Sequence, residues 1–162
     1  MDLAPSRDGM RDFDFLMGSW HVRCRRLRHP LRVSEEWYEF EGTSHNRALW
    51  DGAANVEEVD FASPLGRIRG MAVRVYDPAT RMWSIYWGTS TAGLNVDPNV
   101  GSFDESGAGE FFSDELFEGT PIVSRYRWTH DGPNAARWEQ AFSADGGMTW
   151  QINWIMDFTR AA

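Results

Sequence analysis

The stretch that decides the fold is TWQINWIMDFT, residues 149–159, near the carboxyl end of the chain. Large apolar residues occupy every second position of this stretch, and most positions between them are polar. Successive side chains of an extended strand point to opposite faces, so a period of two predicts a half-buried β-strand. The apolar face of this strand comprises Trp150, Ile152, Trp154, Met156 and Phe158.

Further runs of the same kind follow one another along the chain and are separated by turn signals such as Asp77-Pro78 and Asp131-Gly132-Pro133. The expected strands cover residues 19–27, 34–41, 46–58, 67–76, 82–89, 100–104, 109–117, 122–129, 135–143 and 149–159. Because the turns are short and long crossovers are absent, an all-β, up-and-down antiparallel β-barrel of about ten strands is favoured over a two-sheet sandwich.

The amino-terminal region differs from the strands that follow it. Residues 1–10 show no periodicity and predict a flexible arm. Residues 11–17, RDFDFLM, predict a short helical turn packed across one end of the barrel. The whole chain, residues 1–162, is expected to form a single domain.

Charge and composition narrow the classes of partner. The net charge of −8 argues against nucleic acid, whose binding requires a basic surface. No stretch approaches the roughly 20 apolar residues of a membrane-spanning helix, and the first residues contain no apolar run of signal-peptide length. With a single cysteine, Cys24, the chain forms no internal disulfide. We therefore expect a cytoplasmic protein with neither a nucleic-acid nor a membrane partner.

The chain contains nine tryptophans, more than most cores of this size require. Tryptophan is costly to expose and supplies a large contact area, so some of these residues are expected to line a pocket or a subunit interface. The leading hypothesis is therefore the binding of a small hydrophobic ligand, a largely apolar and aromatic molecule, inside the barrel. A homodimer through outward-facing Tyr38, Phe40 or Tyr86 is an alternative use of the aromatic residues.

Two ends of the chain carry a resemblance. Gly18-Ser19-Trp20 opens the first strand and Arg160 directly follows the last. This pair resembles the calycin superfamily, the lipocalins and fatty-acid-binding proteins, in which a tryptophan of the first strand packs under an arginine of the last. The segments YDPATRMWSIYW (76–87) and RWEQAFSADGGMTWQINWIMDFTR (137–160) resemble an uncharacterised bacterial family of calycin-like proteins. The resemblance implies a lipocalin-like barrel with Trp20 and Arg160 as a structural pair at one end, and it implies no particular activity.

Candidate ligand-binding residues follow from the faces of the strands. If the apolar face of the last strand points inward, its neighbours turn a mixture of aromatic and polar side chains toward the same interior. The candidates are Trp50, Asn55, Trp87, Ser124, Tyr126, Trp138, Gln140 and Trp154. The alternative interpretation is that Tyr126 and Gln140 are core residues hydrogen-bonded across strands.

The expected strand 46–58 has an ambiguous phase. Gly52 indicates a bulge or a tight bend. A bulge at Gly52 would turn both Trp50 and Asn55 inward and would bring Glu57 into the interior, where a carboxyl group is suited to proton transfer. Otherwise Glu57 is a solvated charge at a strand end. Arg74 and Arg125 are expected outside, paired with acids such as Glu139.

Two further hypotheses concern chemistry. Glu57 and Tyr126 are the candidate acid–base residues if the protein is an enzyme of the barrel-cyclase or isomerase type. The histidines His21, His29, His45 and His130 lack the spacing of a metal site, so no metal is expected. A haem-binding barrel remains an alternative, because one axial histidine is enough to hold haem.

Overall fold

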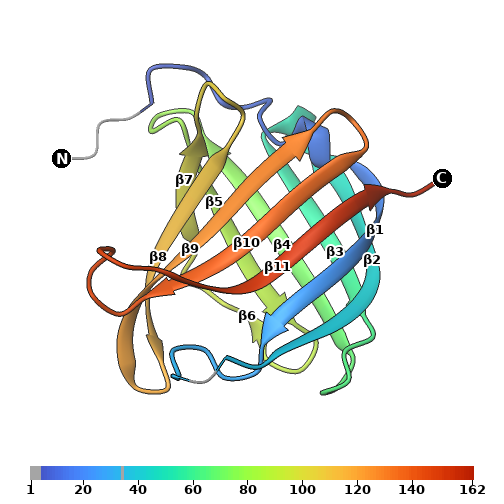
Figure 1. Cartoon of the computed structure of the whole chain (residues 1–162). Coiled ribbons are helices and arrows are strands. Elements are labelled where there is room, and N and C mark those ends of the chain that lie inside the picture. The colour runs from blue at the N-terminus through green and yellow to red at the C-terminus, as the bar shows by residue number, and fades with distance from the viewer. Residues whose placement is uncertain (1–4, 34) are drawn as a thin grey trace.

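The computed structural model of the protein describes residues 5–33 and 35–162. Within these residues the strands are β1 (Gly18–Leu27), β2 (Trp37–Leu49), β3 (Ala54–Phe61), β4 (Ile68–Asp77), β5 (Met82–Thr89), β6 (Gly93–Leu94), β7 (Asn99–Phe103), β8 (Gly109–Phe117), β9 (Thr120–Asp131), β10 (Ala135–Ser143) and β11 (Gln151–Arg160). All pairings are antiparallel, and those of β4 with β5 and of β1 with β11 close the sheet into a ring (Figure 1). The two-residue β6 adds to β5, and the other strands form the predicted ten-stranded barrel.

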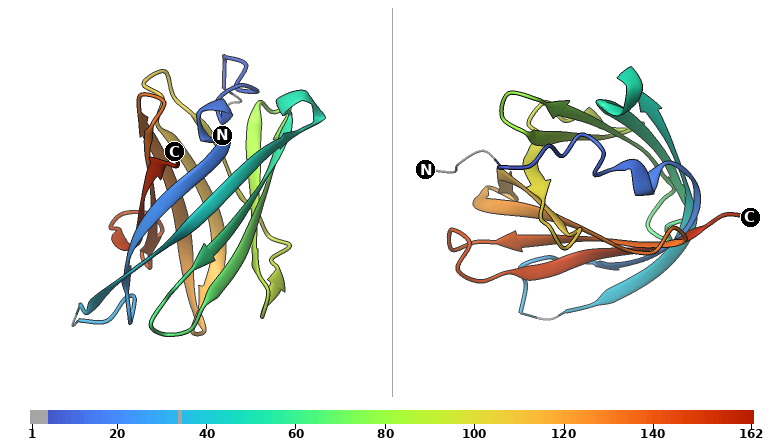
Figure 2. Two further views of the ribbon diagram at one scale, coloured as in Figure 1. Left: turned by 90° about the vertical axis from the view of Figure 1, so that its right-hand side faces the viewer. Right: turned by 90° about the horizontal axis from the view of Figure 1, so that it is seen from above.

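The amino-terminal segment covers one end of the barrel, which we call the plugged end. It includes the predicted helical turn, a 3₁₀ helix η1 (Asp14–Leu16), and it runs across the opening when the barrel is viewed along its axis (Figure 2). Phe13 is 1% exposed and packs edge-on against Trp83 and Phe103, with ring centroids 5.0 Å and 4.9 Å apart. This half of the interior is filled by aromatic rings.

The segment before η1 is joined to the barrel by hydrogen bonds. The carbonyl oxygen of Gly9 accepts a hydrogen bond from the indole nitrogen of Trp83 at 3.0 Å, and the amide of Gly9 donates to the hydroxyl of Tyr76 at 3.0 Å. Arg7 forms an ion pair with Asp12 at 2.6 Å. The predicted flexible arm therefore does not include residues 7–10 in this structure, and its first four residues lie outside the described part.

Arg160 stacks on Trp20, the arrangement that the sequence predicts. The guanidinium carbon lies 3.9 Å from the centroid of the indole ring. Arg160 also donates hydrogen bonds to the carbonyl oxygens of Met17, Phe15 and Pro133, while the Trp20 indole donates to Leu16 at 2.8 Å. These contacts fasten the plug to the first and last strands together.

β2 continues through Gly42, in the gap between the expected strands 34–41 and 46–58, where a turn is therefore expected. A Cβ atom at this position would lie 2.1 Å from the backbone oxygen of Asp60 on β3. Gly42 is therefore required because the neighbouring strand approaches closely, and the glycine does not mark a reversal of the chain.

The expected strand 46–58 is two strands. β2 ends at Leu49, the 3₁₀ turn η2 (Trp50–Gly52) follows, and β3 begins at Ala54. Trp50, Asp51 and Gly52 all have positive φ angles, as a tight reversal requires. Of the bulge and the tight bend that the sequence allows at Gly52, the structure therefore has the tight bend.

A bulge occurs instead in β11. Gln140 of β10 pairs with Trp154, but the next residue, Ala141, pairs with Ile152, so Asn153 is an extra residue. Beyond the bulge the predicted face is correct, and Trp154, Met156 and Phe158 are all buried. Before the bulge the phase is reversed: Ile152 is 36% exposed, and Trp150 precedes the strand and packs beside the exposed Phe112.

Phe40 points into the barrel, so the expectation that it is an outward-facing dimer contact is wrong. It is 5% exposed and packs against Phe61 and Trp154, at centroid distances of 5.9 Å and 6.5 Å.

None of the helices in the described residues combines the length and the apolar character that crossing a membrane would require.

Replacing Arg160 with alanine is expected to destabilise the fold by about 2 kcal/mol, because the variant loses the cation–π contact and leaves carbonyl groups without a donor. Urea unfolding followed by tryptophan fluorescence measures this. Arg23→Ala is the matched control, since Arg23 is exposed and lies 3.6 Å from Glu41 on the outer wall. Equal stabilities of the two variants would contradict a role for Arg160 in holding the plug.

Candidate functional site

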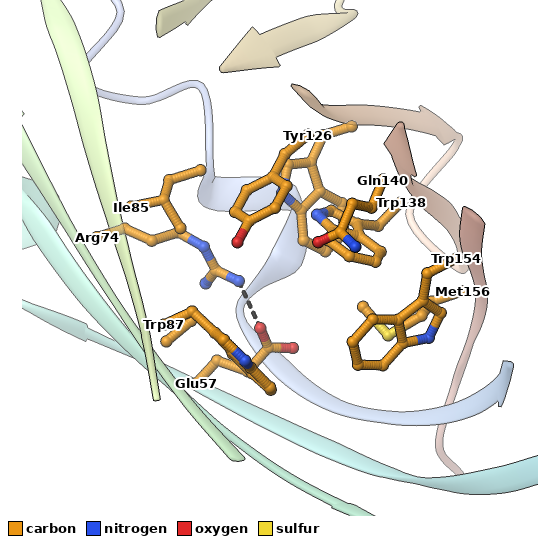
Figure 3. A pocket seen from close by; sticks show the side chains of 11 residues that line it. Glu57, Arg74, Ile85, Trp87, Tyr126, Trp138, Gln140, Trp154 and Met156 are labelled. Atoms are coloured by element: carbon orange, nitrogen blue, oxygen red, sulfur yellow. Dashed lines mark hydrogen bonds and ion pairs between the residues drawn. The ribbon is translucent and has the colours of Figure 1, made fainter. Parts of the chain in front are cut away.

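A cavity occupies the half of the interior away from the plug (Figure 3). The empty space between its lining atoms is about 420 Å³, including the part open to solvent, and about 40 Å³ of it can hold the centre of a water-sized sphere. The cavity is therefore narrow. It is lined by Glu57, Ala72, Arg74, Ile85, Trp87, Tyr126, Trp128, Trp138, Gln140, Trp154 and Met156.

Aromatic side chains of β5, β9, β10 and β11 form most of the cavity wall. The rings of Trp138 and Trp154 meet edge to face at 5.4 Å, and Trp87 meets Trp154 in the same way at 6.3 Å. Tyr126 packs beside Trp138 at 5.1 Å. Edge-to-face contacts fix the orientation of each ring, so the wall presents defined aromatic faces and edges.

An ion pair lies across the cavity from this aromatic wall. The guanidinium of Arg74 on β4 donates to a carboxylate oxygen of Glu57 on β3 at 2.5 Å, and both side chains are almost fully buried. The other oxygen of Glu57 accepts a hydrogen bond from the Ser44 hydroxyl at 2.5 Å, and Arg74 also donates to Asn55 at 2.8 Å. Glu57 therefore lies inside the barrel, and the expectation that Arg74 lies outside is wrong.

Arg74 is held on its other side by aromatic rings. Its guanidinium carbon lies 5.1 Å from the centroid of Phe13 and 5.5 Å from that of Trp128. Burial lowers the pKa of Arg74, and the adjacent Glu57 carboxylate opposes this effect. The buried Nε of Arg74 has no hydrogen-bond partner in the described residues.

Two polar groups beside the ion pair remain accessible. The hydroxyl of Tyr126 is turned toward Arg74 and Glu57 (Figure 3), and burial raises its pKa, so the phenol stays protonated. The amide of Gln140 donates to the side-chain oxygen of Asn153 at 2.8 Å. Tyr126 and Gln140 are only partly buried, so a ligand entering the cavity can reach them.

The structure brings together five of the eight predicted ligand-binding residues: Trp87, Tyr126, Trp138, Gln140 and Trp154. Asn55 is buried behind the cavity wall as a partner of Arg74. Ser124 is buried on β9 but does not line the cavity, and its hydroxyl has no partner in the described residues. Trp50 lies on the turn η2 and is 72% exposed, so its assignment to the cavity is wrong.

Sequence reasoning missed Arg74 and Ala72, which share the inner face of β4. The alternation of β4 contained the signal, because one face of this strand carries Gly70, Ala72 and Arg74 and the other carries larger aliphatic residues. The face with Gly70 and Ala72 points inward, and small residues are needed there because large rings occupy the adjacent space. A Cβ on Gly70 would lie 2.2 Å from the Trp87 ring. Arg125 is partly buried on β9, and its nearest carboxylate is Glu110 at 3.8 Å rather than Glu139.

Histidines are absent from the residues that line the cavity. His21, His29, His45 and His130 are all exposed, and His130 stacks on Phe15 at 4.2 Å. Across residues 5–33 and 35–162, side chains of the metal-binding types do not gather into a group of three. The cavity therefore offers no histidine as an axial ligand for haem.

Comparison with solved structures supports the lipocalin-like architecture. The S-type phycobiliprotein lyase CPES from Guillardia theta superimposes with a TM-score of 0.66 and 12% sequence identity, over 96% of this chain and 94% of that chain. EF1p2_mFAP2b bound to DFHBI superimposes with a TM-score of 0.49 and 13% identity, over 94% and 98% of the two chains. Neither a family model nor a curated protein matches the sequence. At 12% identity the similarity to the lyase establishes the fold alone, and the match with a TM-score of 0.49 supports no conclusion about this chain.

Replacing Arg74 with methionine is expected to destabilise the protein by about 3–5 kcal/mol, because the Glu57 carboxylate would remain buried without its counter-ion. The double variant Arg74→Met with Glu57→Gln is expected to be more stable than the single variant, since both charges are removed. Urea unfolding at neutral pH measures the difference.

The control for this comparison is Arg67→Met, which breaks an ion pair with Asp60 on the exposed surface. That variant is expected to leave the unfolding midpoint nearly unchanged, because water and salt screen exposed pairs. A double variant less stable than Arg74→Met would show that the ion pair is not the dominant contribution of these residues.

Proposed function

We propose that the protein binds a small, flat, largely apolar aromatic molecule in the cavity. The observation that carries this proposal is that Trp87, Trp138, Trp154 and Tyr126 line one space inside the barrel. Sites for small molecules combine apolar and aromatic walls with a few converging polar groups, and this cavity has both.

The dimensions of the cavity favour a flat ligand. The space that can hold the centre of a water-sized sphere, about 40 Å³, is well below the few hundred Å³ typical of small-molecule sites, so lining side chains must move when a ligand enters. Among ligands of similar size, a planar ring system requires the least widening of a narrow, indole-lined cavity, and it can pack against the ring faces. Trp87, Tyr126 and Gln140 are partly exposed and are the lining residues with room to move when a ligand enters.

The polar groups that line the cavity can orient a bound ligand. The Tyr126 hydroxyl and the Gln140 amide lie within the same lining as the indole rings, and each can exchange a hydrogen bond with a ligand. A ligand with one hydrogen-bonding edge would place that edge toward Tyr126 and Arg74 and its ring faces toward β10 and β11.

The arrangement favours binding over acid–base catalysis. Both carboxylate oxygens of Glu57 are engaged, one by Arg74 and the other by Ser44. A general base must reach the proton that it abstracts, and Glu57 would have to leave its buried counter-ion to do so. We therefore assign Glu57 a structural role in the wall of the cavity.

Filling the cavity is expected to abolish binding. Ala72 is buried in the lining opposite Trp87, so Ala72→Leu places additional carbon atoms in the narrow space. Titration with the neutral probe N-phenyl-1-naphthylamine, followed by its fluorescence, is expected to show saturable binding to the unmodified protein and at least about tenfold weaker binding to Ala72→Leu.

The matched control is Ala135→Leu on the outer face of β10, where Ala135 is exposed and the alternate residues Ala136 and Trp138 are buried, so the same group is added outside the barrel. It is expected to leave the affinity unchanged. Because overpacking costs about 1–3 kcal/mol, urea unfolding of both variants verifies that they remain folded. Saturable binding that survives in folded Ala72→Leu would place the probe elsewhere and refute the proposed site.

A further inference from the structure

Arg26 is a cation on the inner face of the barrel. Along β1 the buried residues Trp20, Val22 and Cys24 alternate with exposed ones, and Arg26 continues the inner series. It pairs in register with Tyr38 on one side and Trp154 on the other. Its guanidinium carbon lies 4.0 Å from the centroid of the Trp154 ring, which lines the cavity.

Arg26 also borders a second hollow at the end of the barrel opposite the plug. That hollow, which we call the mouth, includes Arg26, Tyr38, Phe142 and Gln140 among its lining residues. Gln140 lines the cavity as well, so the mouth and the cavity adjoin. A molecule entering from the mouth would pass Arg26 before it reaches the indole rings.

The charge of Arg26 is not neutralised within the described residues. Arg28 pairs with Glu36 at 3.3 Å and Arg32 pairs with Glu118 at 3.2 Å, but no carboxylate of residues 5–33 or 35–162 lies within ion-pair distance of Arg26. Stacking on Trp154 uses the face of the guanidinium and leaves its N–H groups, which lie in the plane, free to donate. The mouth therefore holds a positioned donor for an anion.

We propose that the ligand is amphipathic, an aromatic body with one anionic group, and that Arg26 binds this group while the body occupies the cavity. This inference rests on the proposed function and specifies the chemistry of its ligand. The protein carries a net charge of −8 and therefore repels anions as a whole. Against this overall repulsion, an inward-facing and unpaired arginine attracts an anion at one position inside the barrel. An anion that accepts hydrogen bonds from a guanidinium is bound more strongly than a neutral group of the same shape.

Two fluorescent probes that differ in one group test the inference. 1-Anilinonaphthalene-8-sulfonate carries a sulfonate that N-phenyl-1-naphthylamine lacks, and both share the same aromatic body. The anionic probe is expected to bind about tenfold more tightly than the neutral one, the effect of a single charge-assisted hydrogen bond. Arg26→Gln is expected to remove this preference and to leave the affinity for the neutral probe within about twofold.

Arg25→Gln is the matched control, because Arg25 is the adjacent residue on the exposed face of the same strand and carries the same charge. Arg25→Gln is expected to keep the preference for the anionic probe. Arg26→Lys is expected to keep part of this preference, because the positive charge remains. Equal affinities of the unmodified protein for the two probes, or equal losses in Arg25→Gln and Arg26→Gln, would overturn the role of Arg26 while the binding function stands. Failure of both probes to bind would overturn the proposed function and this inference with it.

Discussion

The buried ion pair of Arg74 and Glu57 divides the interior of the barrel. On one side the guanidinium lies over the rings of Phe13 and Trp128, which belong to the packed half beneath the plug. On the other side the pair lines the cavity. Buried charges are tolerated only when they are paired and hydrogen-bonded, so the surrounding Ser44 and Asn55 are part of the same requirement. Ser44, Asn46 and Asn55 satisfy polar atoms of the pair, and the Nε of Arg74 has no partner in the described residues.

The sequence predicted the strands and their closure wherever one face is apolar and the other polar. β5 and β10 follow that rule, and their predicted ranges agree with the structure. β2 and β3 do not follow it, because their inner faces carry Ser44, Asn46, Asn55 and Glu57. A polar inner face is indistinguishable from a solvated one by hydrophobic periodicity alone. For this reason the sequence left Gly52 open between a bulge and a tight bend, and the course of β2 through Gly42 was missed.

The same limit explains which site residues the sequence could identify. Trp138 and Trp154 were identified because large apolar residues at alternate positions indicate the interior directly. Arg74 was not, since an arginine within a strand is usually exposed and only its three-dimensional partners show otherwise. Trp150 and Ile152 were misplaced because one extra residue, Asn153, reverses the phase of a strand without a signal in the pattern. Two of these departures, the buried Arg74 and the extra residue Asn153, lie in or beside the cavity, where selection for a site can compete with ideal packing.

The contents of the barrel are ordered along its axis. Aromatic rings packed to full density lie under the plug, the Arg74–Glu57 pair follows, the indole-lined cavity comes next, and Arg26 stands at the mouth. The two arginines differ in the property that matters for a ligand: Arg74 is committed to Glu57, whereas Arg26 is stacked on Trp154 with its donors unpaired within the described residues. Trp154 joins the last two layers, because one of its faces contacts Arg26 and its ring also lines the cavity. An occupant that touches Trp154 is therefore held by aromatic contact and lies close to an available positive charge, which couples recognition of its shape to recognition of its charge.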